Sequence, residues 1–401
     1  MEYEIERLDD FGRGICFIDG KICFVYDALP GEVVSIDIKT EKKRYFEGVV
    51  SKYIKKSPFR ISSGCPYYDV CGGCNLRGMD IRLENEYKEE KVCNLLSKFS
   101  NIDTSIVRPI ISNNEKLYRN KIVLHGKDGK LGFYKDKTNE IIEISNCMIS
   151  NSKINEIILA LKLVNKAIDK VLIRTSNDLS NVLVDIVGDV KDIQLIADYC
   201  DVLIVNGEYL TEKKKIISTI GEYKYNLSVN SFFQVNSFIT ESLYNETKSI
   251  VKEFRPHNVL DLYCGTGTIG IYVSKYCDNV IGIDYNKSNI QDALENKKLN
   301  NVHNIEFILD KVENRIDSFN NIDLIIVDPP RAGLDSKTRE YILKILPEVV
   351  VYTSCDPVTL VRDLEELSSN YEISYIQPFN NFPRTYHVEC VSVLCRKTLI
   401  K

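Results

Sequence analysis

Several features are scarce or missing in this 401-residue sequence. No window approaches the roughly 20 consecutive apolar residues of a membrane span, so we expect no membrane partner. The segment Met1–Glu6 is acidic and lacks the basic and apolar regions of a secretory signal, which leads us to expect a cytoplasmic protein. No internal repeat or low-complexity tract is present, which excludes a repeat protein.

Histidine is also scarce: the chain has 4, and none is assigned as a metal ligand or a catalytic base. Cysteine, by contrast, occurs 13 times. In a reducing compartment an odd number of cysteines is not expected to form a disulfide framework. The cysteines therefore indicate metal ligands or a nucleophile.

Length and composition bound the architecture. With 44% hydrophobic and 27% charged residues, the composition is typical of a globular protein. A chain of this length is expected to form about two to four domains, and we divide it into residues 1–57, 58–230 and 231–401. A monomer without an obligatory protein partner is the default expectation.

Residues 1–57 alternate short β-type runs with glycine-containing turns, as in a small β-barrel. The predicted strands are Ile15–Ile18, Ile22–Tyr26 and Val33–Ile38. Although the net charge of the chain is −5, one segment of this region is strongly basic. Small barrels commonly bind nucleic acids, so we interpret this basic segment as a phosphate-contacting surface rather than as a solvated face. Its members are Lys39, Lys42, Lys43, Arg44, Lys52, Lys55, Lys56 and Arg60.

The middle of the chain has a mixed α+β pattern. Helices are predicted at Arg82–Phe99 and Lys153–Ala167, and strands at Lys121–His125, Val182–Val187 and Val202–Val205. Beyond it, strands and helices alternate regularly, which indicates a parallel sheet with helices on both faces, a Rossmann-like α/β domain. Its predicted strands are Val259–Leu262, Val280–Asp284, Ile305–Leu309, Leu324–Val327, Val349–Tyr352, Glu372–Ile376 and Val388–Leu394.

A glycine-rich loop, Asp261–Gly270, follows the first strand of this domain. Gly265 and Gly267 permit a tight turn and a close backbone approach to a ligand. Asp284 ends the next strand, where its carboxylate can accept hydrogen bonds from ribose hydroxyls. A nicotinamide dinucleotide would fit the same features. The acidic residue that opens the loop makes it resemble the first motif of S-adenosylmethionine-dependent methyltransferases.

Candidate catalytic side chains follow two further strands of this domain. The sequence Asp328-Pro329-Pro330 follows the fourth strand and resembles the catalytic-edge motif of enzymes that methylate nucleobases. Enzymes that methylate exocyclic amines tend to follow this motif with an aromatic residue, whereas Arg331 stands here. Cys355 follows the next strand at the same sheet edge, before a helix whose N-terminus can favour a thiolate.

Methylation of a pyrimidine ring carbon requires such a nucleophile. Carbon-5 is not electron-rich enough to attack a methyl group until a thiolate adds at carbon-6. A base must then remove the carbon-5 proton so that the thiol can leave. Uracil-5 and cytosine-5 methylation share this chemistry.

Five ordered motifs resemble those of the uracil-5 RNA methyltransferases, specifically the ribosomal-RNA branch that carries an iron–sulfur cluster. The resemblance covers essentially the whole chain. The motifs are FFQVN at 232–236, the loop at 261–270, DPPRAGL at 328–334, SCDP at 354–357 and HVE at 387–389. Thr268 departs from the pattern, because several members of the family carry Asn there.

This resemblance implies methyl transfer from S-adenosylmethionine to carbon-5 of a uridine in 23S ribosomal RNA. It implies that Cys355 is the nucleophile and Glu389 the base. Contacts to S-adenosylmethionine or the target base would come from Gln234, Tyr263, Gly265, Gly267, Asp284 and Asp328. On the substrate side, Phe232 would stack on the flipped uracil and Arg331 would bind the RNA.

Residues 1–57 resemble a TRAM domain, a small RNA-binding barrel. Cys65, Cys71 and Cys74 form a glycine-containing cluster, and Cys147 is implied as its fourth ligand. Four thiolates suit zinc or an iron–sulfur cluster, and the resemblance implies a 4Fe-4S cluster. The transfer-RNA branch lacks both the barrel and the cysteines, so their presence favours ribosomal RNA.

Two alternative functions stay open from the sequence. The first is a redox-responsive RNA-binding protein that uses the methyltransferase fold as a scaffold, although a scaffold needs neither Cys355 nor Glu389. The second is a pyrimidine-5 methyltransferase with another target, either a uridine in transfer RNA or a cytosine in RNA.

Overall fold

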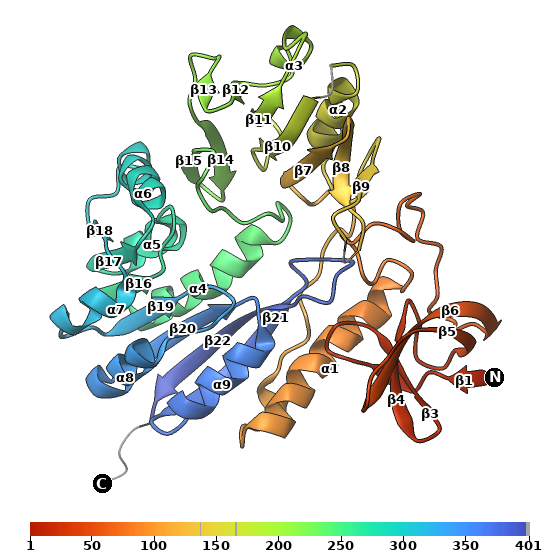
Figure 1. The fold of residues 1–401 in the computed structure, drawn as a ribbon. Coiled ribbons are helices and arrows are strands. Elements are labelled where there is room, and N and C mark those ends of the chain that lie inside the picture. The colour runs from red at the N-terminus through yellow and green to blue at the C-terminus, as the bar shows by residue number, and fades with distance from the viewer. Residues whose placement is uncertain (137, 165–166, 398–401) are drawn as a thin grey trace.

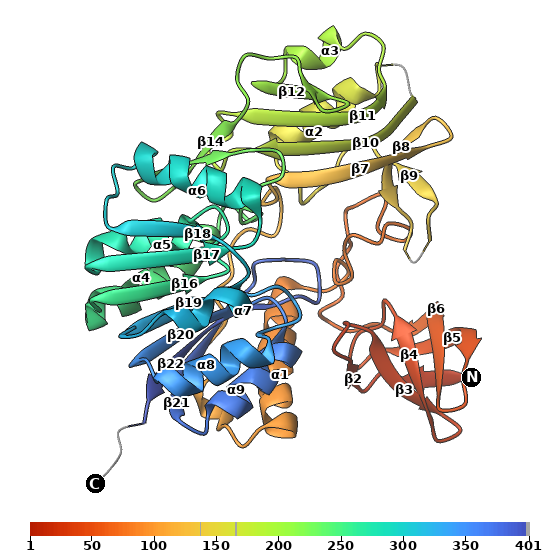
Figure 2. The same cartoon turned by 60° about the vertical axis from the view of Figure 1, so that its left-hand side comes forward.

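The computed structural model describes residues 1–136, 138–164 and 167–397. The chain forms an N-terminal barrel-like sheet, a central sheet domain and a C-terminal Rossmann-like domain (Figure 1). The central domain lies over helix α6 (Lys287–Leu299) of the C-terminal domain, and the barrel lies to the side (Figure 2). Across the described residues, no helix is both long and apolar enough to span a membrane.

The N-terminal sheet has six strands and confirms the expected barrel-like fold. Side chains alternate along its strands, so that Cys23 and Val25 are buried inside while Phe24 lies outside. The structure adds β6, which we did not predict and which pairs with two other strands. The strands are β1 (Glu2–Glu4), β2 (Arg7–Leu8), β3 (Gly14–Ile18), β4 (Lys21–Tyr26), β5 (Val33–Glu41) and β6 (Tyr45–Lys55).

The residues of the basic segment lie on β5 and β6 and in the loops next to these strands, but one of them, Arg60, faces inward. Arg60 forms ion pairs with the buried carboxylate of Glu32 at 2.5 Å and with Asp27 at 3.2 Å. The guanidinium therefore anchors the barrel instead of facing a phosphate. Lys39 is exposed and pairs with Asp37, and further exposed positive charges remain at Lys42, Lys43, Arg44, Lys52, Lys55 and Lys56.

The central domain is a seven-stranded sheet with α2 (Ser152–Leu161) packed on it. The prediction of one helix over Lys153–Ala167 was wrong at its end, because Ala167 begins strand β10; residues 165–166 lie outside the described residues. Pairing with β7 and β11 on both sides draws this segment into the sheet. The strands are β7 (Lys121–Lys127), β8 (Lys130–Tyr134), β9 (Ile141–Glu143), β10 (Ala167–Thr175), β11 (Val182–Asp189), β12 (Val202–Val205) and β13 (Glu208–Tyr209), with α3 (Gln194–Ala197) beside them.

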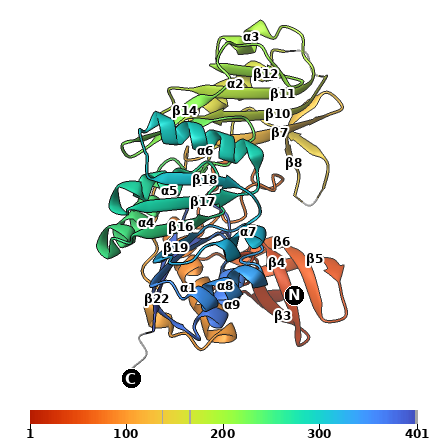
Figure 3. The ribbon, with the colours of Figure 1, turned by 90° about the vertical axis from the view of Figure 1, so that its left-hand side faces the viewer.

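A separate hairpin, β14 (Ile216–Ile220) and β15 (Tyr223–Leu227), joins the central domain to the C-terminal domain. It lies against α6, as Figures 2 and 3 show. Asn296 accepts a hydrogen bond from the backbone of Asn226, and Asp292 forms an ion pair with Lys215 at 2.7 Å. The hairpin thus ties the two domains together through polar contacts.

The C-terminal sheet has the strand order β18-β17-β16-β19-β20-β22-β21. All seven predicted strands are confirmed; the first five run parallel, while β22 runs antiparallel to both of its neighbours. The strands are β16 (Asn258–Leu262), β17 (Asn279–Asp284), β18 (Ile305–Leu309), β19 (Leu324–Val327), β20 (Val349–Ser354), β21 (Tyr371–Phe379) and β22 (Glu389–Arg396).

Helices cover both faces of this sheet. Val349 and Val351 of β20 belong to the apolar core on the side of α4, α5 and α6, and Val350 and Tyr352 belong to the core on the opposite side. The helices are α4 (Thr240–Phe254), α5 (Thr268–Val273), α7 (Val312–Arg315), α8 (Ser336–Ile345) and α9 (Pro357–Leu367), with short 3-10 turns at Thr104–Ile106, Ser274–Tyr276 and Ile316–Ser318.

Helix α1 (Ile81–Phe99), which confirms the predicted helix, packs on the C-terminal sheet although it lies far from it in sequence. Val92, Leu95 and Leu96 share an apolar core with residues of α9, and α1 stands between α9 and the barrel in Figure 1. The helix therefore forms the joint between the barrel and the Rossmann-like domain.

Candidate active site

β16 and β19 are neighbours in the C-terminal sheet. The strands that follow β16 in the chain, β17 and β18, lie on one side of this pair, and those that follow β19 lie on the other side, so the strand order reverses between them. In open α/β sheets, ligands bind beyond the carboxyl ends of the strands at such a point. The glycine-rich loop follows β16 and Asp328 follows β19, so both lie at this edge. Cys355 follows β20, the next strand along the same edge.

The glycine-rich loop has the backbone shape that its sequence predicts. Gly267 has φ +73, and an added Cβ would stand 2.4 Å from a ring carbon of Phe307, so the position accepts only glycine. At Gly265, with φ +55, an added Cβ would meet no atom within 4 Å. The loop therefore borders open space at Gly265, where a cofactor can approach its backbone.

Asp284 is held rigidly beside this loop. Its carboxylate accepts hydrogen bonds from the backbone N–H groups of Gly265 at 3.0 Å and Asn286 at 2.7 Å, and from the Asn289 side chain at 3.2 Å. These bonds fix the carboxylate at the end of β17. Its expected contact with ribose hydroxyls stays a prediction.

Other loop side chains are engaged within the protein. Asp261 is buried and accepts from the Gly270 N–H at 3.0 Å, and burial raises the pKa of its carboxyl to about 8. The Tyr263 hydroxyl donates to Asp335 at the start of α8, at 3.1 Å, so its expected cofactor contact stays a prediction. The Thr268 hydroxyl lies 2.9 Å from the hydroxyl of the buried Tyr244.

Cys355 lies in the turn between β20 and α9. The Asp356 carboxylate caps α9 by accepting from the Val358 N–H at 3.0 Å, and the Ser354 hydroxyl accepts from the Asp356 N–H at 3.2 Å. These bonds define the turn and leave the thiol half-buried at the sheet edge.

The charges around the thiol differ from our expectation. Burial, followed by the negative charges of Glu389 and Asp328, raises the pKa of Cys355 to about 12, while Arg331 acts in the opposite direction. The two carboxyl groups and desolvation outweigh the effect expected from the helix N-terminus. The thiol of the free protein is therefore protonated at neutral pH.

Glu389 and Asp328 form a close acidic pair. Glu389 begins β22 and is buried. Burial and the charge of Asp328 raise the pKa of Glu389 to about 8, and burial raises the pKa of Asp328 to about 7. Like charges at one site do not ionise independently, so the pair holds a proton near neutral pH. Such a pair can accept a proton from a substrate carbon.

A residue that the sequence analysis missed, Asn381, joins two predicted site residues. Its side-chain N–H₂ donates to Gln234 Oε1 at 3.2 Å and to Glu389 Oε2 at 3.3 Å, and all three side chains are buried. The carbonyl of Asn381 accepts from the Asn236 side chain at 2.9 Å. The motif at 232–236 is thereby attached to the segment that carries the candidate base.

Phe232 and Arg331 lie on the open side of the site. The Phe232 ring is 57% exposed, and its backbone bonds to Asn289 and Thr266 place it against the glycine-rich loop. Arg331 is exposed, and one of its guanidinium nitrogens lies 3.3 Å from His387 Nε2. Both are accessible to a large substrate, as expected for residues that contact RNA.

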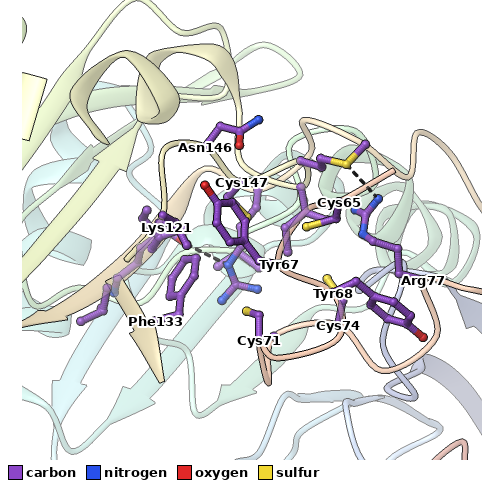
Figure 4. Close-up of a pocket in the computed structure, with 18 of the residues that line it drawn as sticks. Cys65, Tyr67, Tyr68, Cys71, Cys74, Arg77, Lys121, Phe133, Asn146 and Cys147 are labelled. Carbon is purple, nitrogen blue, oxygen red and sulfur yellow. Dashed lines mark hydrogen bonds between the residues drawn. The ribbon is translucent and has the colours of Figure 1, made fainter. Parts of the chain in front are cut away.

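The four predicted ligand cysteines come together around one cavity of about 460 Å³, as Figure 4 shows. Cys65, Cys71, Cys74 and Cys147 are all free and half-buried. Tyr67 connects their two segments, because its hydroxyl accepts from the Ser145 N–H at 2.8 Å. Phe232 also lines the cavity, which therefore reaches the active-site side of the molecule.

Zinc and an iron–sulfur cluster, the two metal centres left open by the sequence, require different spacings of the four thiols in this cavity. Zinc bound by four thiolates at about 2.3 Å would bring the sulfur atoms within about 4 Å of one another. Within the described part of the chain, no three His, Cys, Asp or Glu side chains are arranged to hold a single metal ion. A four-iron cluster is wider than one ion, so its thiolate ligands stand farther apart than those of a single zinc ion.

The charge of the cavity also suits an anionic group. Arg77 is almost completely buried and lines the cavity, and its Nε and Nη2 atoms have no hydrogen-bond partner in the described structure. Burial raises the pKa of Cys74 to about 11, and Arg77 opposes this shift. Cluster thiolates would provide acceptors for these unpaired donors.

Comparisons with known proteins agree with this geometry. The chain matches the family described as tRNA (uracil-5-)-methyltransferase over residues 149–397. It is 32% identical to an uncharacterized RNA methyltransferase of Bacillus cereus and 33% identical to one of Clostridium acetobutylicum; both alignments cover 98% of this chain, with 96% and 97% of the relatives, respectively.

Among solved structures, the chain resembles the Pyrococcus abyssi tRNA (uracil-54, C5)-methyltransferase in complex with S-adenosyl-L-homocysteine. The TM-score is 0.81 at 28% sequence identity, and the alignment covers 98% of this chain and 100% of that one. That bound molecule is what S-adenosylmethionine becomes after methyl transfer. The chain belongs to the tRNA (uracil-5-)-methyltransferase family, as an S-adenosylmethionine-dependent RNA methyltransferase.

Proposed function

We propose that the protein methylates carbon-5 of a uracil in RNA through a covalent bond between Cys355 and carbon-6. The thiolate adds at carbon-6, and the resulting enolate attacks the sulfonium methyl group, which releases S-adenosylhomocysteine. The Glu389 carboxylate then takes the carbon-5 proton, the carbon-5 to carbon-6 double bond re-forms, and the thiolate leaves. The target base must be extruded from its stack to reach this edge, where the exposed Phe232 ring can hold it.

The observation that supports this proposal most strongly is the electrostatic coupling at one sheet edge. The Glu389 and Asp328 carboxylates both raise the pKa of the Cys355 thiol, which supports a nucleophile and a base that act on one substrate position. Catalysis needs the thiolate and the Glu389 carboxylate, and both pKa values are raised. We therefore expect the rate to increase with pH through about 8, the pKa of Glu389.

The test is methyl transfer from radiolabelled S-adenosylmethionine to RNA. Cys355→Ala is expected to abolish transfer, whereas Cys395→Ala, near the far end of β22, retains it. Glu389→Gln is expected to form the adduct without resolving it, so that a denaturation-resistant RNA–protein complex accumulates. Undiminished methylation by Cys355→Ala would refute the mechanism. Nucleoside analysis of the product separates 5-methyluridine from 5-methylcytidine.

For the substrate, we propose 23S ribosomal RNA, with transfer RNA as the second candidate. The barrel and the cysteine cluster supported the first choice because the transfer-RNA branch was expected to lack them. The structure of the Pyrococcus abyssi transfer-RNA enzyme, however, aligns with 98% of this chain. The extent of the chain therefore does not distinguish a ribosomal-RNA enzyme from a transfer-RNA enzyme. Parallel assays on both purified RNAs decide the question: 5-methyluridine in transfer RNA alone would overturn the ribosomal assignment.

We further propose that Cys65, Cys71, Cys74 and Cys147 hold a 4Fe-4S cluster. The shared cavity and the unpaired nitrogens of Arg77 support this assignment. A structural role is expected, because the proposed methyl transfer needs no electron. Protein purified without oxygen should contain about four iron and four sulfide per chain, and Cys74→Ala should lose them, whereas Cys200→Ala should not. Stoichiometric zinc without sulfide would contradict the proposal.

A further inference from the structure

A continuous row of aromatic and cationic side chains runs along the outside of the barrel. The rings of Tyr45 and Phe24 are 5.6 Å apart between centroids. The Arg13 guanidinium lies over Phe24 at 4.3 Å and within 5.5 Å of the Phe11 ring. Ion pairs with Asp9 and Glu47 hold Arg13 in this place, so it positions the rings and its charge is already balanced.

The row continues from the barrel into the active site. The Phe11 ring meets Tyr386 edge to face at 5.5 Å, and the Tyr386 and His387 rings are 4.3 Å apart. His387 in turn contacts Arg331, whose charge acts on Cys355. We name this row the aromatic track; its members are Tyr45, Phe24, Arg13, Phe11, Tyr386, His387 and Arg331.

Helix α1 holds the two halves of the track together. The buried Lys91 ammonium donates to the backbone carbonyl of Asp10 at 2.7 Å and to that of Tyr386 at 3.1 Å. The Tyr87 hydroxyl donates to the Asp9 carbonyl at 2.9 Å. Gly12 lets the loop that carries Phe11 pack closely against Leu76, because an added Cβ would stand 2.5 Å from a side-chain carbon of Leu76. The track is therefore a fixed surface, although two domains contribute to it.

The exposure and chemistry of the track suit single-stranded nucleic acid. Phe11 is 56% exposed and Arg331 is exposed, whereas the rings between them are half-buried. Burial and the charge of Arg331 lower the pKa of His387 to about 4, so its ring is neutral at physiological pH. Neutral aromatic faces bind unpaired bases by stacking, and an exposed guanidinium binds phosphate.

We propose that the aromatic track binds the unpaired RNA nucleotides next to the target uracil, with one base stacked on Phe11. This inference rests on the proposed RNA-methylating function and adds a second, remote point at which the enzyme holds its substrate. An unpaired strand stacked there leads from the barrel to Cys355.

The test compares exposed phenylalanines of one barrel. Binding of a fluorescein-labelled single-stranded oligoribonucleotide of about 12 residues is measured by anisotropy at several salt concentrations. Phe11→Ala is expected to raise Kd, and KM for RNA, by about 5-fold or more, with kcat and the salt dependence unchanged. Phe11→Leu, which keeps apolar packing on Tyr386, should lose affinity likewise, and Phe11→Trp should restore it. Phe17→Ala, exposed by 44% but outside the track, should bind as the native protein does.

Native affinity in both Phe11→Ala and Phe11→Leu would overturn the inference. Equal loss in Phe17→Ala would also overturn it, because the effect would then not belong to the track. Thermal unfolding of each variant shows whether the fold is retained. A native protein that binds this oligoribonucleotide but methylates neither 23S ribosomal RNA nor transfer RNA would contradict the proposed function while leaving the track supported.

Discussion

The side chain of Asn381 favours the ionised form of the candidate base, Glu389. Glu389 is buried beside Asp328, and both circumstances favour its neutral form. The hydrogen bond from Asn381 favours the carboxylate and lowers the pKa of Glu389. Glu389 can act as a base only in its ionised form, so this amide favours the protonation state that the proposed mechanism needs.

Removing this amide should shift the pH profile. In Asn381→Ala the carboxylate loses its donor, so the pKa of Glu389 rises and the increase of kcat with pH moves to higher pH. A hydrogen bond to a charged group contributes about 1.5–3 kcal/mol, which corresponds to a shift of about one to two pH units. Single-turnover rates across pH measure it, with Asn320→Ala, in an exposed loop, as the control. An unshifted midpoint would show that Asn381 does not act on the base.

The sequence predicted the site residues that belong to motifs at strand ends. Cys355, Asp328 and the glycine-rich loop lie at one sheet edge because parallel strands end together. Asn381 could not be predicted, because a lone asparagine between motifs has no recognisable spacing. The raised pKa of Cys355 was also missed, since it depends on burial in the fold and on carboxylates at the ends of two other strands.

At the element scale, α1 fixes the segment that leads to the base. The Lys88 ammonium is fully buried and donates to Glu84 at 2.9 Å, to the Asn380 side chain at 2.7 Å and to the Phe382 carbonyl at 3.2 Å. Glu84 also accepts from the backbone N–H of Arg384 at 2.9 Å. All three donors of the ammonium are satisfied, so α1 and residues 380–384 form one polar unit.

Breaking this ion pair should destabilise the protein. Lys88→Met removes the nearer of two cations from the buried Glu84 carboxylate, since the Arg384 guanidinium remains at 3.5 Å, and breaking a buried ion pair costs about 3–5 kcal/mol. We expect a lower unfolding temperature and a lower kcat, and partial recovery in the double variant Lys88→Met/Glu84→Gln. Lys98→Ala, exposed on the last turn of the same helix, is the matched control. Equal unfolding temperatures for Lys88→Met and Lys98→Ala would argue against a structural role for the pair.

Elements with a strong local pattern were predicted, and those that depend on their neighbours were not. Helix α1 and the seven strands of the C-terminal sheet have clear apolar periodicity. Strand β6 has only part of its side chains buried, and its pairing with β4 and β5 forms it. Likewise, β10 was not predicted as a strand, and its first residue, Ala167, was assigned to the end of a helix, because only its two partner strands reveal it.

At the scale of the whole molecule, a negatively charged protein presents a local positive surface. The net charge is −5, while Lys52, Lys55 and Lys56 are exposed near the end of β6. Lysine contacts with phosphates release counterions, so they make RNA affinity dependent on salt. Stacking on the aromatic track does not release counterions. The two surfaces can therefore be separated by their salt dependence.

The triple variant Lys52→Ala/Lys55→Ala/Lys56→Ala should bind RNA more weakly and with less dependence on salt. The slope of log K against log salt is expected to fall by about 2, from about 0.7 for each phosphate contact with a single strand. The control removes three exposed lysines of the central domain, Lys191, Lys213 and Lys214. An unchanged slope in the first variant, or an equal change in both, would show that the basic segment does not contact RNA.

The place of α1 in the fold has a consequence for the order in which the chain acquires its shape. This helix is synthesised early, but its buried partners, α9 and residues 380–384, are among the last to leave the ribosome. The barrel can form as soon as its own strands are synthesised. Until its C-terminal partners are synthesised, α1 has an exposed apolar face and an exposed Glu84–Lys88 ion pair that is buried in the complete fold. Nascent chains should therefore be inactive and open to proteases until synthesis is almost complete, with the catalytic edge as the final part to assemble.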